Sequence, residues 1–367
     1  MKAVRFTEWK TKPSLQEVPK PKPAPGEVLL KVAGAGACHS DVAVYEQFDE
    51  STAGAQLAPE YTLGHETAGW IEEVGEGVLG LTKGDAYLVY GPIGCGHCAA
   101  CSRGQDTYCE NAAKTPFLAS GLGKDGGMAE YMTVPARNLV PLGDADPVAA
   151  APLADAGLTP YHAIKLALHK LQGGGKTALV IGLGGLGQIA VQILKATTAA
   201  TVIATDMKPE AMELAAKRGA VTVDGGEGQA DAIRELTDGK GVDAVFDFVG
   251  LTPTIQLAQQ VVAKQGRITV VGIAGGPVSW DFYSNPYEAE LTNTYWGTIE
   301  ELHELAALYR EGHIEVDVTR FPLDDALAAY EHLEKGTLLG RAVVVPHLDD
   351  ATTASLQAVA DRMPAGV

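Results

Sequence analysis

The stretch "TALVIGLGGLGQIAVQILKATTAATVIATD", residues 177–206, decides the fold class of this chain. It opens with a short apolar run, turns at the glycine-rich "GLGGLG", and closes with a second apolar run. Short apolar runs beside glycine predict buried strands, and the helical spacing of Ile189, Ala190 and Ile193 predicts a helix that packs on a sheet. A strand, a glycine turn, a helix and a strand in this order are typical of a parallel βαβ unit.

The same alternation of strand and helix continues beyond this unit. We expect a helix over 210–219, a strand over 244–250, a helix over 254–264 and a strand over 267–272. Repeated βα units predict a doubly wound parallel sheet with helices on both faces, which is the Rossmann type of α/β architecture. We assign this domain to residues 157–298.

The glycine loop meets the requirements of a dinucleotide-binding turn. Gly182 permits the tight turn, Gly184 lets the backbone approach a pyrophosphate, and Gly187 lets the helix pack closely on the strand. Backbone amides at the start of the helix then face the phosphates. A plain glycine-rich turn is the alternative, but the position between a strand and a helix favours dinucleotide binding.

Asp206 ends the strand that follows the glycine loop. A carboxylate there accepts both ribose hydroxyls and repels a 2′-phosphate, which favours NAD over NADP. A helix cap is the alternative for Asp206, and the nearby Lys208 leaves NADP open. The residues expected to contact the cofactor from this domain's strand ends are Gly182, Leu183, Gly184, Gly185, Leu186, Gly187, Asp206, Phe248, Val249, Gly272 and Ile273.

Short β-leaning runs punctuated by glycine and proline fill the rest of the chain. They predict a β-rich catalytic domain over residues 1–156, and a chain of 367 residues is long enough for two domains. Residues 299–346 return to this domain through a helix expected over 299–312 and two short strands. The tail, residues 347–367, is expected to be a helix or disordered.

Charge and composition exclude several classes of partner. The net charge of −18 repels nucleic-acid backbones and anionic membrane surfaces. No apolar stretch has the length and position of a secretory signal or a membrane span. Five cysteines is an odd number, and four of them lie close together, so we expect thiolates in a reducing cytoplasm rather than a secreted disulfide framework.

Four cysteines follow the spacing C-x2-C-x2-C-x7-C: Cys95, Cys98, Cys101 and Cys109. Thiolates at this spacing predict a closed tetrahedral zinc site of the structural kind, in a lobe over about residues 91–112. An iron–sulfur cluster is one alternative, although the proline usual after the fourth cysteine is missing. A pair of disulfides is the other alternative. His97 lies inside the loop but is not needed as a ligand.

The fifth cysteine, Cys38, stands apart from this lobe. A catalytic zinc needs three protein ligands and one open position. Cys38 offers a thiolate and His65 an imidazole, and the third ligand is expected to be Asp155, with Glu66 as the rival. Taken singly, such residues are commoner as a buried thiol, a core histidine and a helix cap. Only their combination with a dinucleotide domain favours a metal site.

Several ordered motifs resemble those of the zinc-containing medium-chain alcohol dehydrogenases. They are "CHSD" at 38–41, "GHE" at 64–66, the four-cysteine lobe, "GLGGLG" at 182–187 and "GRAVVV" at 340–345. "PLADAGLTPYHA" at 152–163 is most similar to the bacterial NAD-dependent secondary-alcohol branch, in which the third zinc ligand is an aspartate. The resemblance covers residues 1–346 and implies a GroES-like catalytic domain in addition to the Rossmann domain.

The resemblance also implies a role for each of several active-site residues. Cys38, His65 and Asp155 hold the catalytic zinc, whose open position takes water or the substrate oxygen. Hydride then passes from a zinc-bound alkoxide to the nicotinamide. Ser40 accepts the alcohol proton, and Asp41 supports His65 from behind.

Further roles come from the same resemblance. Glu66 lies beside the zinc and pairs with Arg341, which itself resembles a pyrophosphate contact. His39 is expected near the pyrophosphate and Thr159 near the nicotinamide. Many members carry a relay histidine where this chain has Ala43, so the proton is expected to leave through water or the cofactor ribose. The expected walls of the substrate pocket are Tyr45, Phe48, Tyr61, Leu118, Tyr295 and Trp296.

The expected function is therefore the NAD-linked, reversible oxidation of alcohols, mainly secondary ones, to ketones or aldehydes, with two zinc ions per chain. A polyol, amino-alcohol or formaldehyde dehydrogenase of the same family is the first alternative, and a non-catalytic NAD-binding protein is the second. The expected substrate is a small alcohol or ketone, and we expect neither nucleic acid nor a membrane as a partner. We also expect a cytoplasmic homotetramer or homodimer.

Overall fold

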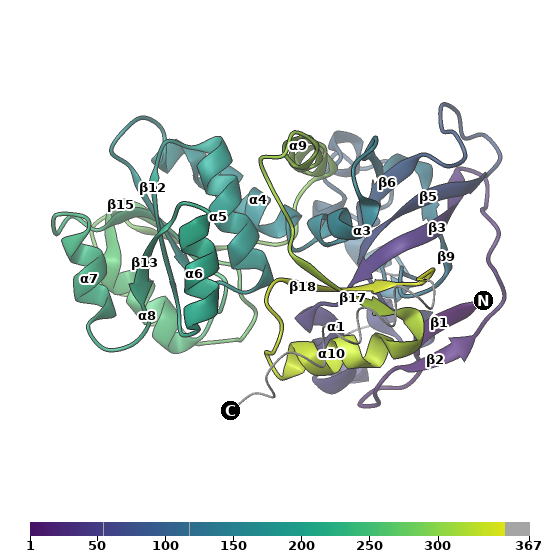
Figure 1. Cartoon of the computed structure of the whole chain (residues 1–367), viewed down its shortest axis with the longest axis horizontal. Helices are drawn as coiled ribbons and strands as arrows, with labels where there is room; N and C mark the ends of the chain where they lie inside the picture. Colours follow the sequence, from purple (N-terminus) through teal and green to yellow (C-terminus); the bar gives the residue numbers. More distant parts are fainter. Residues whose placement is uncertain (54, 117, 349–367) are drawn as a thin grey trace. The chain divides into compact units, whose positions relative to one another are not determined.

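The computed structural model describes residues 1–53, 55–116 and 118–348, which form two compact units (Figure 1). The first unit comprises Met1–Asp155, Thr298–Arg310 and the chain from Val316 onward. The second comprises Ala156–Gly297 and Glu311–Glu315. Most of the predicted tail, residues 349–367, lies outside the described residues. None of the helices in the described residues has both the length and the apolar composition needed to cross a membrane.

The second unit contains a parallel sheet of six strands in the order β13-β12-β11-β14-β15-β16. Chain order reverses between β11 and β14, as in the doubly wound dinucleotide-binding fold. The strands are β11 (Thr177–Ile181), β12 (Thr201–Asp206), β13 (Val221–Asp224), β14 (Val242–Asp247), β15 (Val262–Val270) and β16 (Glu290–Asn293). The helices are α4 (Leu158–Ala167), η7 (Leu168–Lys170), α5 (Gly185–Thr197), α6 (Pro209–Lys217), α7 (Gln229–Glu235) and α8 (Thr252–Val261).

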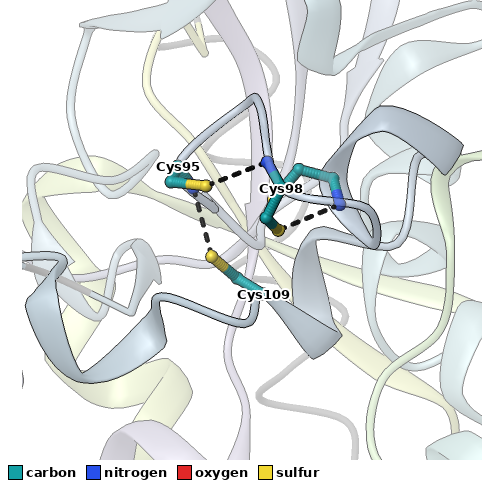
Figure 2. Close-up of side chains that lie close together, drawn as sticks. Cys95, Cys98 and Cys109 are labelled. Carbon is teal, nitrogen blue, oxygen red and sulfur yellow. Dashed lines mark hydrogen bonds between the residues drawn. The ribbon is translucent and has the colours of Figure 1, made fainter.

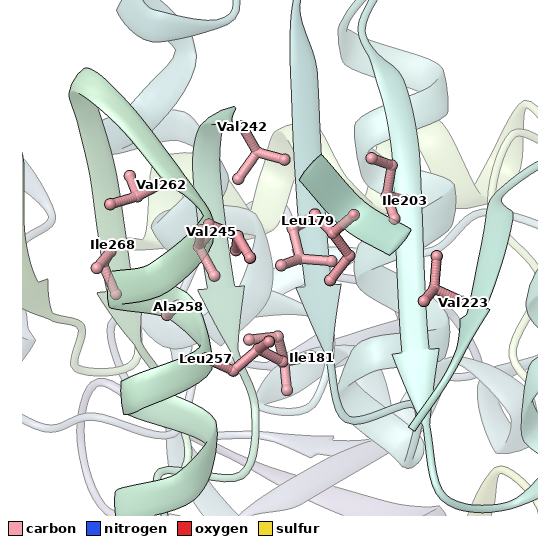
Figure 3. Close-up of a cluster of buried hydrophobic side chains, with 12 residues drawn as sticks. Leu179, Ile181, Ile203, Val223, Val242, Val245, Leu257, Ala258, Val262 and Ile268 are labelled. Carbon is pink, nitrogen blue, oxygen red and sulfur yellow. The ribbon is translucent and has the colours of Figure 1, made fainter. Parts of the chain in front are cut away.

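The packing of this sheet explains why the sequences of its strands are continuous apolar runs. On one face, Leu179 and Ile181 pack with residues of α7 and α8, including Leu257 (Figure 3). The alternate residues Ala178 and Val180 point to the opposite face and are also buried, where α5 contacts β11 and β12. Both faces are therefore covered, as the alternation of strands and helices predicts.

One helix boundary differs from the sequence-based expectation of a helix over 254–264. Helix α8 ends at Val261, and β15 begins at the next residue. Val262 pairs with Val242 in a parallel register that shifts before Ala244. The β-branched Val262 is buried in the sheet, so tertiary pairing overrides the helical pattern.

The first unit is built on a seven-stranded, mostly antiparallel sheet in the order β10-β6-β5-β3-β18-β17, with β9 also paired to β3. The strands are β3 (Glu27–Gly36), β5 (Glu66–Val74), β6 (Ala86–Val89), β9 (Tyr131–Pro135), β10 (Leu139–Pro141), β17 (Val318–Pro322) and β18 (Arg341–Val345). Smaller sheets are formed by β1 (Lys2–Phe6), β2 (Ser14–Glu17) and β4 (Tyr61–Thr62), and by β7 (Ala119–Ser120) with β8 (Gly123–Lys124).

Short helices connect these strands. They are α1 (His39–Glu46), α2 (Glu50–Ala53), η1 (Ala55–Leu57), η2 (Cys101–Arg103), η3 (Asp106–Tyr108), η4 (Ala112–Lys114), η5 (Ala136–Asn138), α3 (Pro147–Ala150), η6 (Ala151–Ala154), α9 (Ile299–Arg310), η8 (Leu323–Asp325) and α10 (Ala326–Glu334). Helix α9 confirms the helix expected over 299–312, and β17 and β18 confirm the two strands that follow it.

Candidate active site

Strand ends bring together the residues that the sequence singles out near Cys38. Gly36, the last residue of β3, pairs with Glu66, the first residue of β5, and also with Val343 of β18. Cys38 follows β3 by two positions, and His65 immediately precedes β5. Because antiparallel neighbours end and begin at the same edge, these two side chains and Arg341 lie at one end of the sheet.

Four potential ligand side chains meet at this edge, and we call them the Cys38 cluster: Cys38, His65, Glu66 and Asp155. One ligand atom from each lies within 4.8 Å of those of the others. The Asp155 Oδ2 atom, placed at the end of η6, is 3.7 Å from the Cys38 Sγ and 3.5 Å from the His65 Nε2. A thiolate, an imidazole and a carboxylate together are a donor set that zinc accepts.

His65 is fully enclosed and held from both sides of its ring. Its Nδ1 lies 3.0 Å from the Asp41 Oδ1, and its Nε2 lies 3.1 Å from the Ser40 Oγ. Burial lowers the pKa of His65, but the charge of Asp41 and the hydrogen bonds that Asp155 and Asp41 accept from the ring outweigh it and place the pKa well above its ordinary value. The surroundings of His65 therefore favour a positive charge. The contact expected between Asp41 and His65 is present.

Glu66 is buried behind the other members of the cluster, and the ion pair expected with Arg341 is present. The Arg341 Nη2 donates to the Glu66 Oε1 and, at 3.0 Å, to the Ala37 carbonyl. Burial raises the pKa of Glu66 to about 7, against the opposing charge of Arg341. The other carboxylate oxygen, Oε2, is buried and has no hydrogen-bond partner among the described residues. A cation held by the cluster would satisfy this oxygen, so the residues present fit a metal ion.

Gly36 provides the space that Glu66 occupies. A Cβ atom at Gly36 would lie 1.9 Å from the Glu66 Oε2 and 2.9 Å from the Glu66 Cβ. Such contacts are impossible without displacing the carboxylate. No local pattern predicts this role, because the partner of Gly36 is thirty positions away and becomes visible only in the β3–β5 register.

The four-cysteine lobe forms a second candidate metal centre, and Figure 2 shows three of its cysteines, Cys95, Cys98 and Cys109. The sulfur atoms of Cys95, Cys98, Cys101 and Cys109 all lie within 4.8 Å of one another, and all five cysteines of the chain are free thiols. The disulfide alternative is therefore not adopted. Backbone amides point at the sulfurs: the Cys98 N–H at the Cys95 Sγ (3.4 Å) and the Cys95 N–H at the Cys109 Sγ (3.3 Å).

These amide contacts favour thiolates in the lobe. A hydrogen bond from Asn111, together with backbone amides, lowers the pKa of Cys95 to about 5. Backbone amides of Cys101 and Glu110 lower the pKa of Cys98 as well, whereas burial raises that of Cys101. Thiolates crowded together need a cation, and four sulfur ligands fit a tetrahedral zinc ion.

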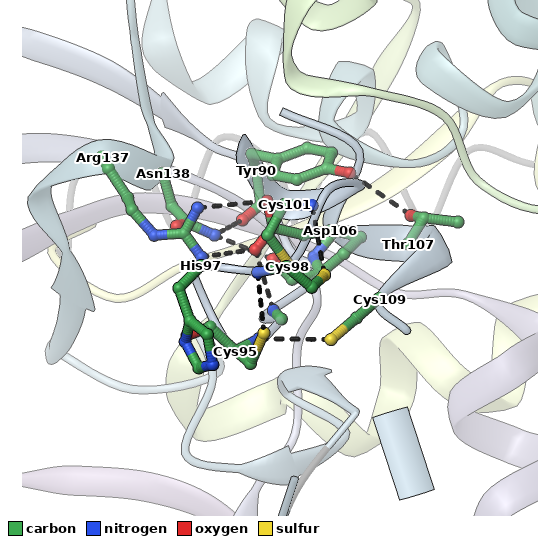
Figure 4. Close-up of polar contacts among 12 residues, drawn as sticks. Tyr90, Cys95, His97, Cys98, Cys101, Asp106, Thr107, Cys109, Arg137 and Asn138 are labelled. Carbon is green, nitrogen blue, oxygen red and sulfur yellow. Dashed lines mark hydrogen bonds and ion pairs between the residues drawn. The ribbon is translucent and has the colours of Figure 1, made fainter. Parts of the chain in front are cut away.

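A buried carboxylate anchors the loop that carries these cysteines. Asp106 accepts the Gly94 N–H (2.9 Å) and is paired with the guanidinium of Arg137, as Figure 4 shows. Asn138, which follows Arg137 in the chain, donates to the carbonyls of Tyr90 (2.9 Å) and Pro92 (2.8 Å). Asp106 and Arg137 could not be predicted as partners, because nothing in their local sequence indicates that they meet.

The glycine loop of the second unit has the geometry that a close backbone approach requires. Gly182 has a φ of 86°, and a Cβ there would lie 2.6 Å from the Val249 Cγ2. A Cβ at Gly187 would lie 1.9 Å from the Gly182 carbonyl oxygen, whereas Gly184 is exposed with open space around it. The carboxylate of Asp206 reaches the loop and accepts the Leu183 N–H at 2.6 Å.

The remaining predicted contacts are spread over both units. In the second unit Thr159 lies on α4, Phe248 and Val249 follow β14, and Gly272 and Ile273 follow β15, Ile273 being exposed. Tyr295 is exposed and Trp296 is buried. In the first unit His39 is the exposed first residue of α1.

The predicted pocket residues of the first unit differ in their surroundings. Tyr45 is buried, and its hydroxyl donates to the Glu334 Oε1 at 2.8 Å. Tyr61 is also buried, with its ring edge-on to Phe6. Phe48 and Leu118 are half-buried. The assignment of these four residues, and of Tyr295 and Trp296, to a substrate pocket remains a prediction.

Comparisons with known proteins agree with this geometry. Residues 24–144 match the alcohol dehydrogenase GroES-like domain family, and residues 185–311 match the zinc-binding dehydrogenase family. An NAD-dependent alcohol dehydrogenase of Sulfurisphaera tokodaii is 36% identical over 94% of this chain and its own full length. The D-arabinose 1-dehydrogenase (NADP(+)) of Saccharolobus solfataricus is 33% identical over 94% of this chain and 97% of its own.

A solved structure gives the same result. The alcohol dehydrogenase of Aeropyrum pernix superimposes with a TM-score of 0.85 and 39% identity, covering 94% of this chain and 100% of its own. The predicted GroES-like and doubly wound fold class is thereby confirmed. The chain belongs to the zinc-containing medium-chain alcohol dehydrogenase family, and it is an enzyme of the alcohol dehydrogenase type.

Proposed function

We propose that this enzyme catalyses the NAD-linked, reversible oxidation of mainly secondary alcohols to ketones, or of other alcohols to aldehydes, with a zinc ion held by Cys38, His65 and Asp155. The observation that carries the proposal is the convergence of three different donor side chains from three separate segments of the first unit. Glu66 stands beside them with an unpartnered buried oxygen, as a neighbour of the ion or a transient ligand.

Zinc, when bound, supplies a Lewis acid that lowers the pKa of an alcohol hydroxyl and favours hydride loss to the nicotinamide. The protein's own side chains transfer the proton and orient His65. Ser40, whose hydroxyl lies beside the His65 Nε2, accepts the alcohol proton while its own hydroxyl proton passes on. Asp41 accepts a hydrogen bond from the His65 Nδ1–H and so directs Nε2 towards the ligand position. No histidine follows at Ala43, so the proton leaves through water or the cofactor ribose.

NAD is the proposed cofactor. The exposed Gly184 and the start of α5 present free amides for a pyrophosphate. Asp206, at the end of β12, offers a carboxylate for the adenosine ribose and repels a 2′-phosphate. The relative from S. tokodaii is named as NAD-dependent, whereas the D-arabinose enzyme is named with NADP. We also propose that His39, Thr159 and Arg341 contact NAD.

A second zinc ion in the four-cysteine lobe completes the proposed metal content of two per chain. Four thiolates leave no open position and quench the Lewis acidity of the ion, so this site is structural. We also expect the family's homodimeric or homotetrameric assembly for this chain.

A polyol or sugar dehydrogenase that uses the same zinc and cofactor residues is the second candidate. The named activity of the S. solfataricus relative on D-arabinose favours it. A polyol or sugar needs polar partners for its additional hydroxyl groups, so the substrate panel described below separates the two candidates.

A substrate panel on wild type and Cys38→Ala tests the proposal. Secondary alcohols, primary alcohols, polyols and threonine are each assayed for reduction of NAD and NADP. We expect the highest kcat/KM with a secondary alcohol and NAD. In Cys38→Ala, turnover falls by about 1000-fold or more, because the group that positions and activates the oxygen is lost. NAD binding, measured by quenching of protein fluorescence, stays at the wild-type level. Undiminished turnover in Cys38→Ala would refute the catalytic assignment, and a sugar or polyol as the best substrate would favour the second candidate.

A further inference from the structure

Asp41, the residue behind His65, is itself held by a partner from the far end of the chain. Its carboxylate is fully buried on α1. Oδ1 faces the His65 Nδ1 at 3.0 Å, while Oδ2 accepts the Cys38 N–H at 3.1 Å and the Tyr330 hydroxyl at 3.1 Å. The amide contact closes the first turn of α1, as in a capping box, so Tyr330 is the partner that Oδ2 receives from another helix of the described residues.

The position of Tyr330 is fixed by packing between α1 and α10. Its side chain is 3% exposed, and its ring meets Tyr45 of α1 edge-on, with the centroids 6.1 Å apart. The Tyr45 hydroxyl in turn donates to Glu334, one helical turn after Tyr330. The ring contact, which a phenylalanine at position 45 would keep, holds the Tyr330 ring against α1 and leaves its hydroxyl little freedom.

Tyr330 also stays a donor at every working pH. Burial and the charge of Asp41 raise its pKa well above the ordinary value. A neutral phenol facing a buried carboxylate gives a charge-assisted hydrogen bond, which is stronger than a bond between two neutral groups. Removing it leaves Oδ2 with a single backbone donor in a fully buried place.

We propose that Tyr330 is a positioning residue of the active site, which holds the Asp41 carboxylate in the plane that orients His65 towards the zinc ion. The inference rests on the proposed zinc site at Cys38, His65 and Asp155. Without the phenol, the carboxylate can turn about its terminal torsion, and the imidazole loses its fixed direction. A group that hydrogen-bonds directly to a metal ligand, as Asp41 does to His65, is worth about 10–100-fold in metal affinity. Tyr330 acts one step further out, so we expect an effect at the lower end of this range.

The chain offers a matched control for this inference. Tyr330→Phe and Tyr45→Phe remove the same atom from the two rings of one aromatic pair. Only the first removal touches Asp41, since the Tyr45 hydroxyl bonds to Glu334. A difference between the two variants in zinc retention therefore reports on the Asp41 contact and not on the packing of α1 against α10.

The experiment measures zinc retention by the full-length, zinc-loaded protein against increasing concentrations of a chelator. Wild type and Tyr45→Phe are expected to release the more labile zinc ion at the same chelator concentration, and Tyr330→Phe at about a tenfold lower one. Replacement of this ion by Co²⁺ adds a second readout, because a changed ligand direction shifts the visible absorption bands. Retention and spectrum of Tyr330→Phe equal to wild type would overturn the inference while leaving the proposed function standing. A wild type with no labile zinc at all would overturn both.

Asp41→Asn and the double variant Asp41→Asn/Tyr330→Phe separate positioning from general destabilisation. If Tyr330 acts through Asp41, the double variant loses zinc no more readily than Asp41→Asn alone. Additive losses in the double variant would show a role independent of Asp41 and would overturn the inference. This test remains valid if Tyr330→Phe lowers the melting temperature. It compares the change in zinc retention that Tyr330→Phe causes in the wild-type protein with the change that it causes in Asp41→Asn.

Discussion

The four-cysteine lobe and the Cys38 cluster are two candidate metal centres built in opposite ways. The lobe takes four identical ligands from the single stretch 95–109, and backbone amides of that same stretch support the sulfurs. The cluster takes a thiolate, an imidazole and a carboxylate from positions as far apart as Cys38 and Asp155. A local site of four thiolates is closed and suits a structural ion, whereas a mixed site assembled by strand ends keeps room for a substrate.

The two centres nevertheless share one feature: each contains a glycine whose missing side chain leaves space for a potential ligand. At Gly36 the space is filled by the Glu66 carboxylate. At Gly94 a Cβ would lie 2.4 Å from the Cys101 Sγ and 2.9 Å from the Asp106 Oδ1. Neither glycine has the positive φ that would explain it by backbone conformation. Adding a methyl group at each position therefore tests the two centres by the same chemical change.

The larger effect on turnover is expected from Gly36→Ala. The new methyl group displaces Glu66 and strains its pair with Arg341, close to Cys38 and His65. Displacements of about 1 Å in an active site cost on the order of 100-fold in rate, and overpacking costs about 1–3 kcal/mol of stability. Steady-state kinetics with the best secondary alcohol measure the first effect and thermal unfolding the second. Wild-type turnover in Gly36→Ala would show that the position of Glu66 does not matter to catalysis.

A smaller effect on turnover is expected from Gly94→Ala. Its methyl group pushes on Cys101 and Asp106, so affinity for the lobe's zinc falls by about tenfold or more and the melting temperature drops. Turnover per intact molecule changes little, because the lobe has no open position for a substrate. Gly174→Ala is the control for both glycine variants: nothing lies within 4 Å of the added Cβ, and neither property should change. If Gly94→Ala lost turnover as completely as Gly36→Ala, the assignment of the lobe as structural would be wrong.

The same contrast explains what could be predicted from the sequence. The lobe is visible in the spacing of Cys95, Cys98, Cys101 and Cys109, because a single loop carries all its ligands. The glycine loop is visible in the same way, since Gly182 and Gly187 act within one strand–turn–helix unit. Local sequence determines both, and the fold class follows from the alternation of strands and helices around them.

Several supports of the two metal centres could not be predicted in this manner. Tyr330 meets Asp41 across 289 positions, and Arg137 meets Asp106 across 31. Gly36 looks like any small residue at the end of a strand until the register with Glu66 is known. Such contacts depend on strand order and helix packing, which no short pattern contains. Resemblance to a family predicts the ligands, the Asp41–His65 contact and the Glu66–Arg341 pair, but neither Tyr330 nor Gly36.

The number of zinc ions per chain decides whether Cys38 belongs to a metal site. Elemental analysis is made on purified wild type, Cys38→Ala and Cys101→Ala, each normalised to protein concentration. We expect two zinc ions in wild type and one in each variant. In Cys38→Ala the remaining ion resists chelation, since it sits in the closed lobe, whereas in Cys101→Ala the remaining ion is the labile one. A single zinc ion in wild type, or two in Cys38→Ala, would contradict the assignment of Cys38 to an open metal site.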